Sequence, residues 1–145
     1  MSGIIVFYAG GAISWTSRRQ DCVSLSTMEA EYVALSETCQ EVVWLQRLLV
    51  DFGEELTEPT VVYEDNQGCL SFATSERTSK RIKHIETKQC YVRNLCEQRV
   101  VQLCYCPTEN MKADILTRPL GAIKHFQLAK SIGLQSTCGT TVEEE

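Results

Sequence analysis

Long apolar runs are absent from this 145-residue sequence, and none approaches the roughly 20 residues that a membrane-spanning helix needs. The first residues also lack the pattern of a secretory signal peptide. These absences predict an intracellular protein with no membrane partner. No internal repeat or low-complexity tract is present. The composition, 43% hydrophobic and 23% charged, is that of a soluble globule, and the length predicts one domain with a real core.

Cysteine pairs with C-x-x-C spacing, which many zinc sites use, are also missing. Eight cysteines are nevertheless present, at positions 22, 39, 69, 90, 96, 104, 106 and 138. Because no signal peptide indicates an oxidising compartment, we interpret them as reduced thiols of the core in preference to a zinc site or disulfides.

Positive charge is scarce, and the net charge of −5 argues mildly against a nucleic-acid partner. Three of the negative charges lie at residues 143–145, however, and the distribution matters more than the total. The basic residues gather at Arg77, Lys80, Arg81 and Lys83, with His84 beside them. At the start of a predicted helix this group opposes the helix dipole, so it faces either an anion such as phosphate or solvent.

The stretch from Thr60 to Gly68 organises the chain. Its β-branched and aromatic residues predict a buried strand, Thr60 to Glu64, followed by a turn and a short helix, Gln67 to Ala73. Asn66 can cap this helix. Asp65 then stands at the carboxyl end of a central strand, where open α/β sheets gather their ligands. Taken alone, Asp65 is better explained as a turn or capping residue.

A long helix precedes this stretch. Ser26 and Glu29 form a capping-box pattern at its start, and Gly53 suits its end. An apolar stripe at spacings of three and four consists of Met28, Tyr32, Leu35, Cys39, Val42, Leu45 and Leu49. Glu31 borders this stripe, where a carboxylate is costly unless a cation or hydrogen bonds satisfy it. We therefore favour Glu31 over Glu29 for chemistry, the alternative being a side chain that extends into solvent at the helix edge.

The remaining elements are predicted from turns and periodicity. We expect a hairpin, a second long helix, a strand, a short helix that contains Asp114, and a final amphipathic helix. The expected ranges are 4–8 and 12–16 for the hairpin, 82–95, 100–106, 111–117 capped by the turn 108–110, and 123–132. Residues 135–145 are expected to be disordered.

Three acids, Glu31, Asp65 and Asp114, fall on three separate elements. Carboxylates that meet in one cleft form a site for Mg²⁺, which prefers oxygen ligands and binds substrate phosphates. Two such ions about 4 Å apart can activate a water and stabilise the leaving oxygen in phosphodiester cleavage. The spacing alone leaves open whether the acids converge.

Five short motifs occur in order around these acids. They are Gly10-Gly-Ala-Ile-Ser-Trp15, Ser24-Leu-Ser-Thr-Met-Glu-Ala-Glu-Tyr-Val-Ala-Leu35, Asp65-Asn-Gln67, Lys83-His-Ile85 and Asp114-Ile-Leu-Thr-Arg-Pro-Leu120. Together they resemble the ribonuclease H domain at the end of copia-type retrotransposon Pol polyproteins. Each motif is modest by itself, but five in order are specific.

The resemblance implies an α/β fold, a ribonuclease H-like mixed sheet flanked by helices, over residues 1–134, followed by a disordered acidic tail over 135–145. It implies Mg²⁺-dependent hydrolysis of the RNA strand of RNA–DNA hybrids during reverse transcription, at a two-ion site. The implied partners are the hybrid and the reverse transcriptase domain of the same polyprotein. The implied location is the cytoplasm, in a virus-like particle, or the nucleus.

By their positions in the motifs, Glu31, Asp65 and Asp114 match the second, third and fourth catalytic acids of that family. Asp65 would bridge the metal ions and Asp114 would complete the second metal site. Glu31 would bind metal and help to order the 2′-OH, which distinguishes RNA from DNA. The implied nucleic-acid-binding residues are Arg77, Lys80, Arg81, Lys83, His84, Asn66 and Gln67.

One departure from the family pattern is serious. The first catalytic aspartate of the family lies on a strand before the position of Ser2, between the hairpin and the strand 60–64 in the sheet, and this chain lacks that strand. Its aspartates are Asp21, Asp51, Asp65 and Asp114. We therefore expect two unpaired strand edges, an incomplete metal site, and weak or absent activity. The alternative is a degenerate or co-opted fragment that acts as a non-catalytic binding module.

Overall fold

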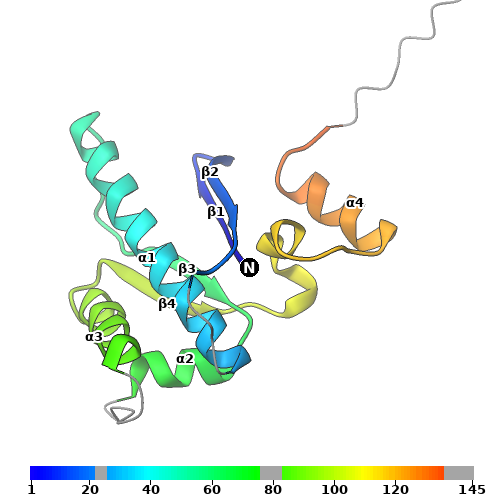
Figure 1. Cartoon of the computed structure of the whole chain (residues 1–145). Coiled ribbons are helices and arrows are strands. Elements are labelled where there is room, and N and C mark those ends of the chain that lie inside the picture. The colour runs from blue at the N-terminus through cyan, green and yellow to red at the C-terminus, as the bar shows by residue number, and fades with distance from the viewer. Residues whose placement is uncertain (22–25, 76–82, 136–145) are drawn as a thin grey trace, which may run out of the picture.

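The structure is a computed structural model that describes residues 1–21, 26–75 and 83–135. It shows strands and helices in a mixed α/β arrangement, which confirms the α/β part of the predicted class, while the ribonuclease H-like sheet stays a prediction (Figure 1). The basic residues Arg77, Lys80 and Arg81 lie outside the described residues, as do the side chains of Lys83 and His84. The tail from residue 136 onward, predicted to be disordered, also lies outside them.

The chain begins with the predicted hairpin, formed by β1 (Ser2–Tyr8) and β2 (Gly11–Arg18) in antiparallel pairing. Ala9 and Gly10 connect the strands with φ values of 50° and 84°. Positive φ at both loop residues gives a turn whose twist matches that of the flanking strands. The conformation of this turn therefore favours the pairing of the two strands.

Helix α1 (Thr27–Asp51) is the longest element and begins and ends as predicted. The Ser26 hydroxyl accepts a hydrogen bond from the Glu29 N–H at 3.2 Å, and Gly53 follows the helix with a φ of 92°. Five members of the predicted stripe are buried, namely Tyr32, Leu35, Cys39, Val42 and Leu45, while Met28 and Leu49 are half-buried. The stripe prediction is thus confirmed at its centre.

The main core lies where α1 packs with a second pair of strands and two more helices. Strands β3 (Thr60–Glu64) and β4 (Val101–Tyr105) pair in parallel. Helices α2 (Gln67–Thr74) and α3 (Lys83–Glu97) lie beside α1, and buried side chains of all five elements form one cluster (Figure 1). The Asn66 side chain accepts a hydrogen bond from the Cys69 N–H at 3.0 Å, which confirms it as the cap of α2.

The segment after β4 corrects one prediction. Residues 111–117 were expected to form a short α-helix capped by the turn 108–110. The structure has two 3₁₀ helices instead, η1 (Thr108–Asn110) and η2 (Lys112–Leu116), with no side-chain cap on either. A single turn of helix gains little from propensity, so packing against β1 decides its geometry. Helix α4 (Ala122–Ser131) follows as predicted, with Gly133 just beyond it at a φ of 92°.

The two pairs of strands form separate sheets. Within the described residues, β1 pairs with β2 and β3 pairs with β4, so no single mixed sheet forms. Helix α1 contacts both sheets. It holds the hairpin through Ser14 Oγ to Glu41 Oε1 at 2.7 Å and Arg18 Nη2 to Glu37 Oε1 at 2.8 Å. On the other side, Gln46 Nε2 donates to the Thr60 hydroxyl at 2.8 Å.

The described cysteines are free thiols in several environments. Cys39 and Cys69 are buried, and Cys96, Cys104 and Cys106 are half-buried. Cys90 is exposed, so the interpretation of the cysteines as core thiols is wrong for this residue. In the described part of the chain, no helix is both long and apolar enough to cross a membrane.

Candidate metal centre

A cavity of about 960 Å³ separates the two sheets. Residues Gly3 to Phe7 of β1 line one side and Thr60 to Glu64 of β3 line the other. Helix α1 and the η2 segment complete the wall. The predicted acids Glu31, Asp65 and Asp114 all line this one cavity, although they are far apart in the sequence.

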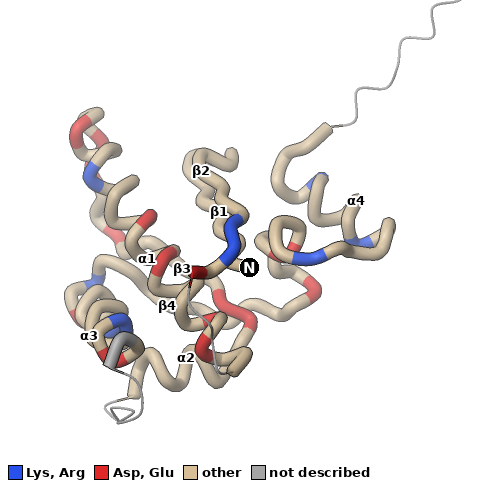
Figure 2. Tube along the Cα trace, viewed as in Figure 1, with Lys and Arg blue, Asp and Glu red and all other residues tan. Residues whose placement is uncertain are grey.

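Three carboxylates gather at one end of the cavity. Oxygens of Glu31, Glu64 and Asp65 lie within 4.8 Å of one another. Glu31 comes from the first turns of α1, and Glu64 and Asp65 come from the end of β3, where the chain turns into α2. In Figure 2, acidic positions occur along α1 and at the turn between β3 and α2.

Glu64 is the most deeply buried of the three, with only 7% of its surface exposed. Burial raises its pKa from 4.5 to about 7, and the neighbouring Glu31 and Asp65 add to this rise. The Asn66 N–H, which donates to Glu64 Oε1 at 3.0 Å, acts in the opposite direction. Burial also raises the pKa of Glu31, with a further contribution from Asp65. The cluster therefore holds negative charge that its surroundings do not fully compensate.

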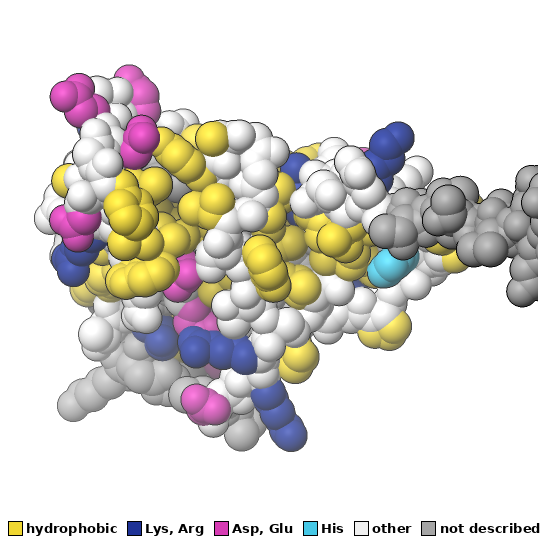
Figure 3. Space-filling model, turned by 90° about the horizontal axis from the view of Figure 1, so that it is seen from above, with side chains coloured by type: hydrophobic (Ala, Val, Ile, Leu, Met, Phe, Trp, Pro, Cys, Tyr) yellow, Lys and Arg dark blue, Asp and Glu magenta, His cyan; other side chains and the backbone are white. Residues whose placement is uncertain are grey.

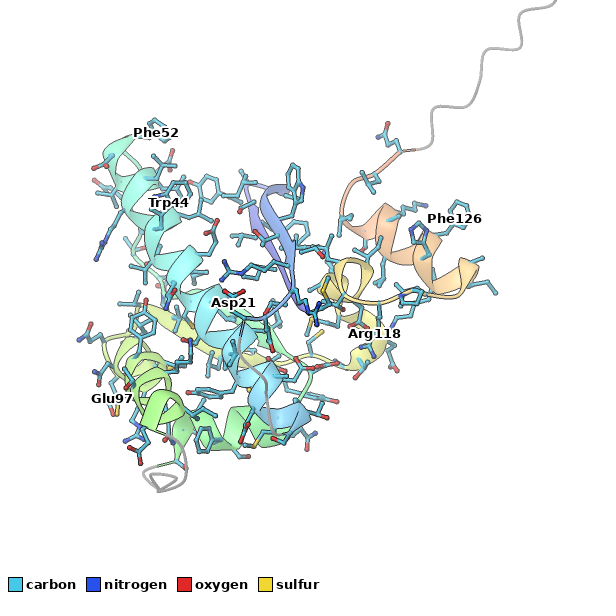
Figure 4. The ribbon with its side chains drawn as sticks, in the orientation of Figure 1. Asp21, Trp44, Phe52, Glu97, Arg118 and Phe126 are labelled. Carbon is cyan, nitrogen blue, oxygen red and sulfur yellow. The ribbon has the colours of Figure 1, made fainter. Side chains whose placement is uncertain are left out.

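Asp114 is buried in the same cavity but is already neutralised. Arg118 Nη2 lies 2.6 Å from its Oδ1, and Lys124 Nζ lies 2.9 Å from its Oδ2. The hydrogen bond to Asp114 raises the pKa of Arg118. Arg118 lies on the segment of the chain that connects η2 to α4 (Figure 4). Basic and acidic side chains also lie side by side near the middle of the face in Figure 3.

The structure brings some of the predicted site residues together and places others elsewhere. It brings Glu31 and Asp65 together, with Asp114 in the same cavity but outside the group of three mutually close carboxylates. Asn66 serves as a helix cap, and Gln67 is exposed at the start of α2. The catalytic and nucleic-acid-binding roles of these residues stay predictions.

Three residues at the site were missed by the sequence analysis. Glu64 had a usable signal, because it lies two residues after buried Val62 on the same face of β3. Arg118 lies four residues after Asp114, a spacing that favours an ion pair. Lys124 is ten residues from Asp114 and on a different element, so no local pattern indicates their contact.

The residues present fit a hard divalent cation. The cluster offers carboxylate oxygens, which are the ligands that Mg²⁺ prefers. A cation there would offset the charge that burial leaves uncompensated on Glu31 and Glu64. Asp114 is already paired with two cations, so its charge is compensated without a metal.

The sequence of the chain is similar to those of several known proteins. The chain is 36% identical over 136 residues to "Retrovirus-related Pol polyprotein from transposon TNT 1-94" of Nicotiana tabacum, a match that covers 93% of the chain. The chain is a relative of transposon Pol polyproteins. The corresponding polyproteins from transposons RE1 and RE2 of Arabidopsis thaliana are 33% and 32% identical, each over 92% of the chain.

The match covers only a small part of each Pol polyprotein. The chain spans about a tenth of the length of each, 10% for the tobacco protein and 9% for the two from Arabidopsis. No protein-family model matches the chain, and no solved structure matches it. The predicted resemblance to a retrotransposon Pol polyprotein is therefore confirmed, while the ribonuclease H region stays a prediction.

Proposed function

We propose that this chain is the ribonuclease H part of a copia-type Pol polyprotein, acting on the RNA strand of an RNA–DNA hybrid. One observation supports this most: Glu31 and Asp65, from segments far apart in the sequence, meet within 4.8 Å in a cavity that Asp114 also lines. The relationship to Pol polyproteins makes a nucleic-acid substrate the natural candidate. We expect this chain by itself to have weak or absent activity.

Different residues of the chain would bind the metal, position Asp114 and face the substrate. Mg²⁺ would be bound by Glu31, Glu64 and Asp65. Asp114 would be kept in its orientation in the absence of metal by its ion pairs with Arg118 and Lys124. When bound, Mg²⁺ would supply an activated water and stabilise the leaving oxygen of the phosphodiester. Glu31 would face the 2′-OH, the group that identifies RNA.

The first test is a Mg²⁺ titration of the purified chain, followed by NMR of its side-chain carboxylates. We expect saturable shifts at Glu31, Glu64 and Asp65. Asp65→Asn should weaken binding at least tenfold, whereas Asp51→Asn, which changes an exposed acid at the end of α1, should leave it unchanged. Unsaturable shifts, or equal binding by the two variants, would contradict a metal site here.

The second test is cleavage of a hybrid with a labelled RNA strand. The chain should cut it slowly or not at all. A graft of the stretch that precedes the matched region in the tobacco relative, joined ahead of Met1, should restore Mg²⁺-dependent cleavage. Asp65→Asn in the grafted chain should abolish it, and double-stranded DNA should not be cut.

The alternative function is a non-catalytic binding module. It is favoured by Asp114, whose charge is already compensated by Arg118 and Lys124 without a metal. A grafted chain that folds and binds the hybrid, but does not cut it, would favour this alternative.

A further inference from the structure

Helix α1 carries a second row of apolar residues near its carboxyl end, where the helix extends beyond the strands (Figure 1). Trp44, Leu48 and Phe52 follow one another at spacings of four, and Phe52 is the cap residue of the helix. Residues four apart lie on one face of a helix. Trp44 is 56% exposed and Phe52 is 75% exposed, while Leu48 is half-buried. We call these three residues the outer stripe.

The outer stripe continues the face of α1 on which the hairpin packs. Glu41 Oε1 accepts a hydrogen bond from the Ser14 hydroxyl of β2, and Trp44 follows Glu41 by three residues on the same face. Figure 4 shows Trp44 on the side of α1 that faces the hairpin. The Tyr8 hydroxyl, at the end of β1, donates to Glu54 Oε2 at 2.8 Å. This hydrogen bond joins the hairpin to the segment beyond α1, so the stripe and its border belong to one connected surface.

The border of the outer stripe is acidic. Four exposed acids lie at this end of α1 and in the loop that follows, namely Asp51, Glu54, Glu55 and Glu58. The sequence has no lysine or arginine from residue 48 to residue 76. The last turn of α1 has no basic residue either, so the partial negative charge of the helix end adds to that of the acids. Figure 3 shows hydrophobic and acidic side chains gathered at one end of the molecule.

The outer stripe is separate from the cavity between the sheets. Neither its three residues nor the four acids of its border line that cavity. A function of this surface therefore goes beyond the proposed hydrolysis and does not depend on a metal. Aromatic side chains are also enriched at the centres of protein interfaces, where they contribute much of the binding energy.

The acidic border disfavours two kinds of occupant. A nucleic acid would bring its phosphates against the four carboxylates. A second copy of this chain, bound by the same face, would bring two acidic borders together. The charge instead favours a partner that presents lysine or arginine.

The shape of the outer stripe favours a helical partner. Side chains at spacings of four form a ridge that packs into the groove of a second helix. Trp44 and Phe52 lie about 12 Å apart along the helix axis, which is about two turns of a partner helix.

We propose that the outer stripe binds an amphipathic basic helix of another protein. Apolar side chains on one face of that helix pack on Trp44, Leu48 and Phe52. Lysine or arginine side chains beside that face pair with Asp51 and Glu55 and with the carboxyl end of α1.

The test uses a synthetic probe, a capped peptide of about 18 residues, which is long enough to form a helix. It carries leucine and alanine on one face and lysine beside that face. The Trp15→Phe chain keeps Trp44 as its one tryptophan, so its fluorescence reports on the outer stripe. We expect saturable one-to-one binding and an emission shift to shorter wavelength as Trp44 leaves water. A probe with glutamate in place of lysine should bind at least tenfold more weakly.

Variants with fewer apolar side chains locate the binding. Trp44→Ala combined with Phe52→Ala should weaken probe binding at least tenfold in calorimetry. Ile123→Ala combined with Phe126→Ala, which removes two exposed apolar side chains of α4, is the matched control and should leave binding unchanged. Circular dichroism checks that both variants fold. Equal binding by the two variants would show non-specific adsorption and would overturn the proposal.

Variants with fewer charges test the acidic border. Asp51→Asn combined with Glu55→Gln should weaken probe binding about fivefold, because two exposed ion pairs are lost. Glu97→Gln combined with Glu109→Gln removes two exposed charges elsewhere and should leave binding unchanged. Equal weakening by the two variants would show that only the net charge attracts the probe, and would overturn the proposal.

Sedimentation of the chain alone tests the second copy as occupant. We expect a monomer at the concentrations of the titration. A dimer that Trp44→Ala dissociates would show that the outer stripe joins two copies of this chain, and would overturn the proposal. Absence of probe binding would also overturn it, whatever the outcome of the metal titration.

Discussion

Glu64 makes the stability of the fold depend on pH. Its folded-state pKa of about 7 lies above the ordinary 4.5, so the folded chain keeps a proton that the unfolded chain loses between these values. The free energy of unfolding should therefore fall as pH rises from 4.5 to about 7, by up to about 3 kcal/mol, and level off above that. Glu64→Gln should flatten this dependence and be more stable than the natural chain at pH 8. Urea unfolding over this pH range measures it.

The control for this prediction is Glu58→Gln, which changes an exposed acid in the loop before β3. It should leave the pH dependence as it is. If Glu64→Gln and the natural chain lose stability in parallel from pH 4.5 to 7, another group carries the effect.

Gly3 is required by a close approach. A Cβ there would lie 2.5 Å from Thr117 Cγ2 and 3.0 Å from the Ala113 carbonyl oxygen. Gly3→Ala should lower the free energy of unfolding by about 1 to 3 kcal/mol through overpacking. Thr117→Ser should relieve part of this loss, because the backbone oxygen remains. Gly11→Ala in β2, where no heavy atom lies within 4 Å, is the matched control; equal losses at the two glycines would contradict this explanation.

At the scale of elements, Lys124 joins α4 to the segment that precedes it. Lys124 Nζ binds Asp114 Oδ2 at 2.9 Å and the Thr108 carbonyl at 3.1 Å, and so connects α4 to both 3₁₀ helices. Lys124→Ala should leave one oxygen of buried Asp114 unpaired, at a cost of about 1 to 3 kcal/mol. We expect faster proteolysis and amide exchange within α4. Lys130→Ala, in an exposed position of the same helix, should change neither; protection of α4 that survives Lys124→Ala would show another anchor.

Elements whose ends are set locally were the ones that the sequence predicted well. Ser26 and Asn66 cap their helices, and Gly53 and Gly133 follow helix ends at positive φ, because each needs only its near neighbours. The segment 111–117 was wrong in type because contact with β1 shapes it. The same holds for the site residues. Glu31 was predicted from its position on the helix face, whereas the contact of Lys124 with Asp114 depends on the tertiary fold.

At the scale of the whole molecule, the stability should be uneven. The cluster of buried residues draws on α1, α2, α3, β3 and β4, and none of its members comes from the hairpin. Hairpin amides should therefore exchange through local openings that cost less free energy than global unfolding. Glu41→Ala, which removes the partner of Ser14, should speed exchange in the hairpin but not in α3. Exchange that changes equally in both would show a single cooperative unit. Glu97→Ala, at an exposed position of α3, is the control.

The position of Met1 has a practical consequence for anyone who produces this protein. Met1 lines the cavity, and its amino group opposes a small part of the rise that burial causes in the pKa of Glu31. Vector-derived residues ahead of Met1, such as a polyhistidine tag or a protease-site scar, would begin at the wall of the cavity and bring metal-binding or charged groups to the carboxylates. An affinity measured on such material would describe the tag as much as the protein, so the purification handle belongs at the other end of the chain.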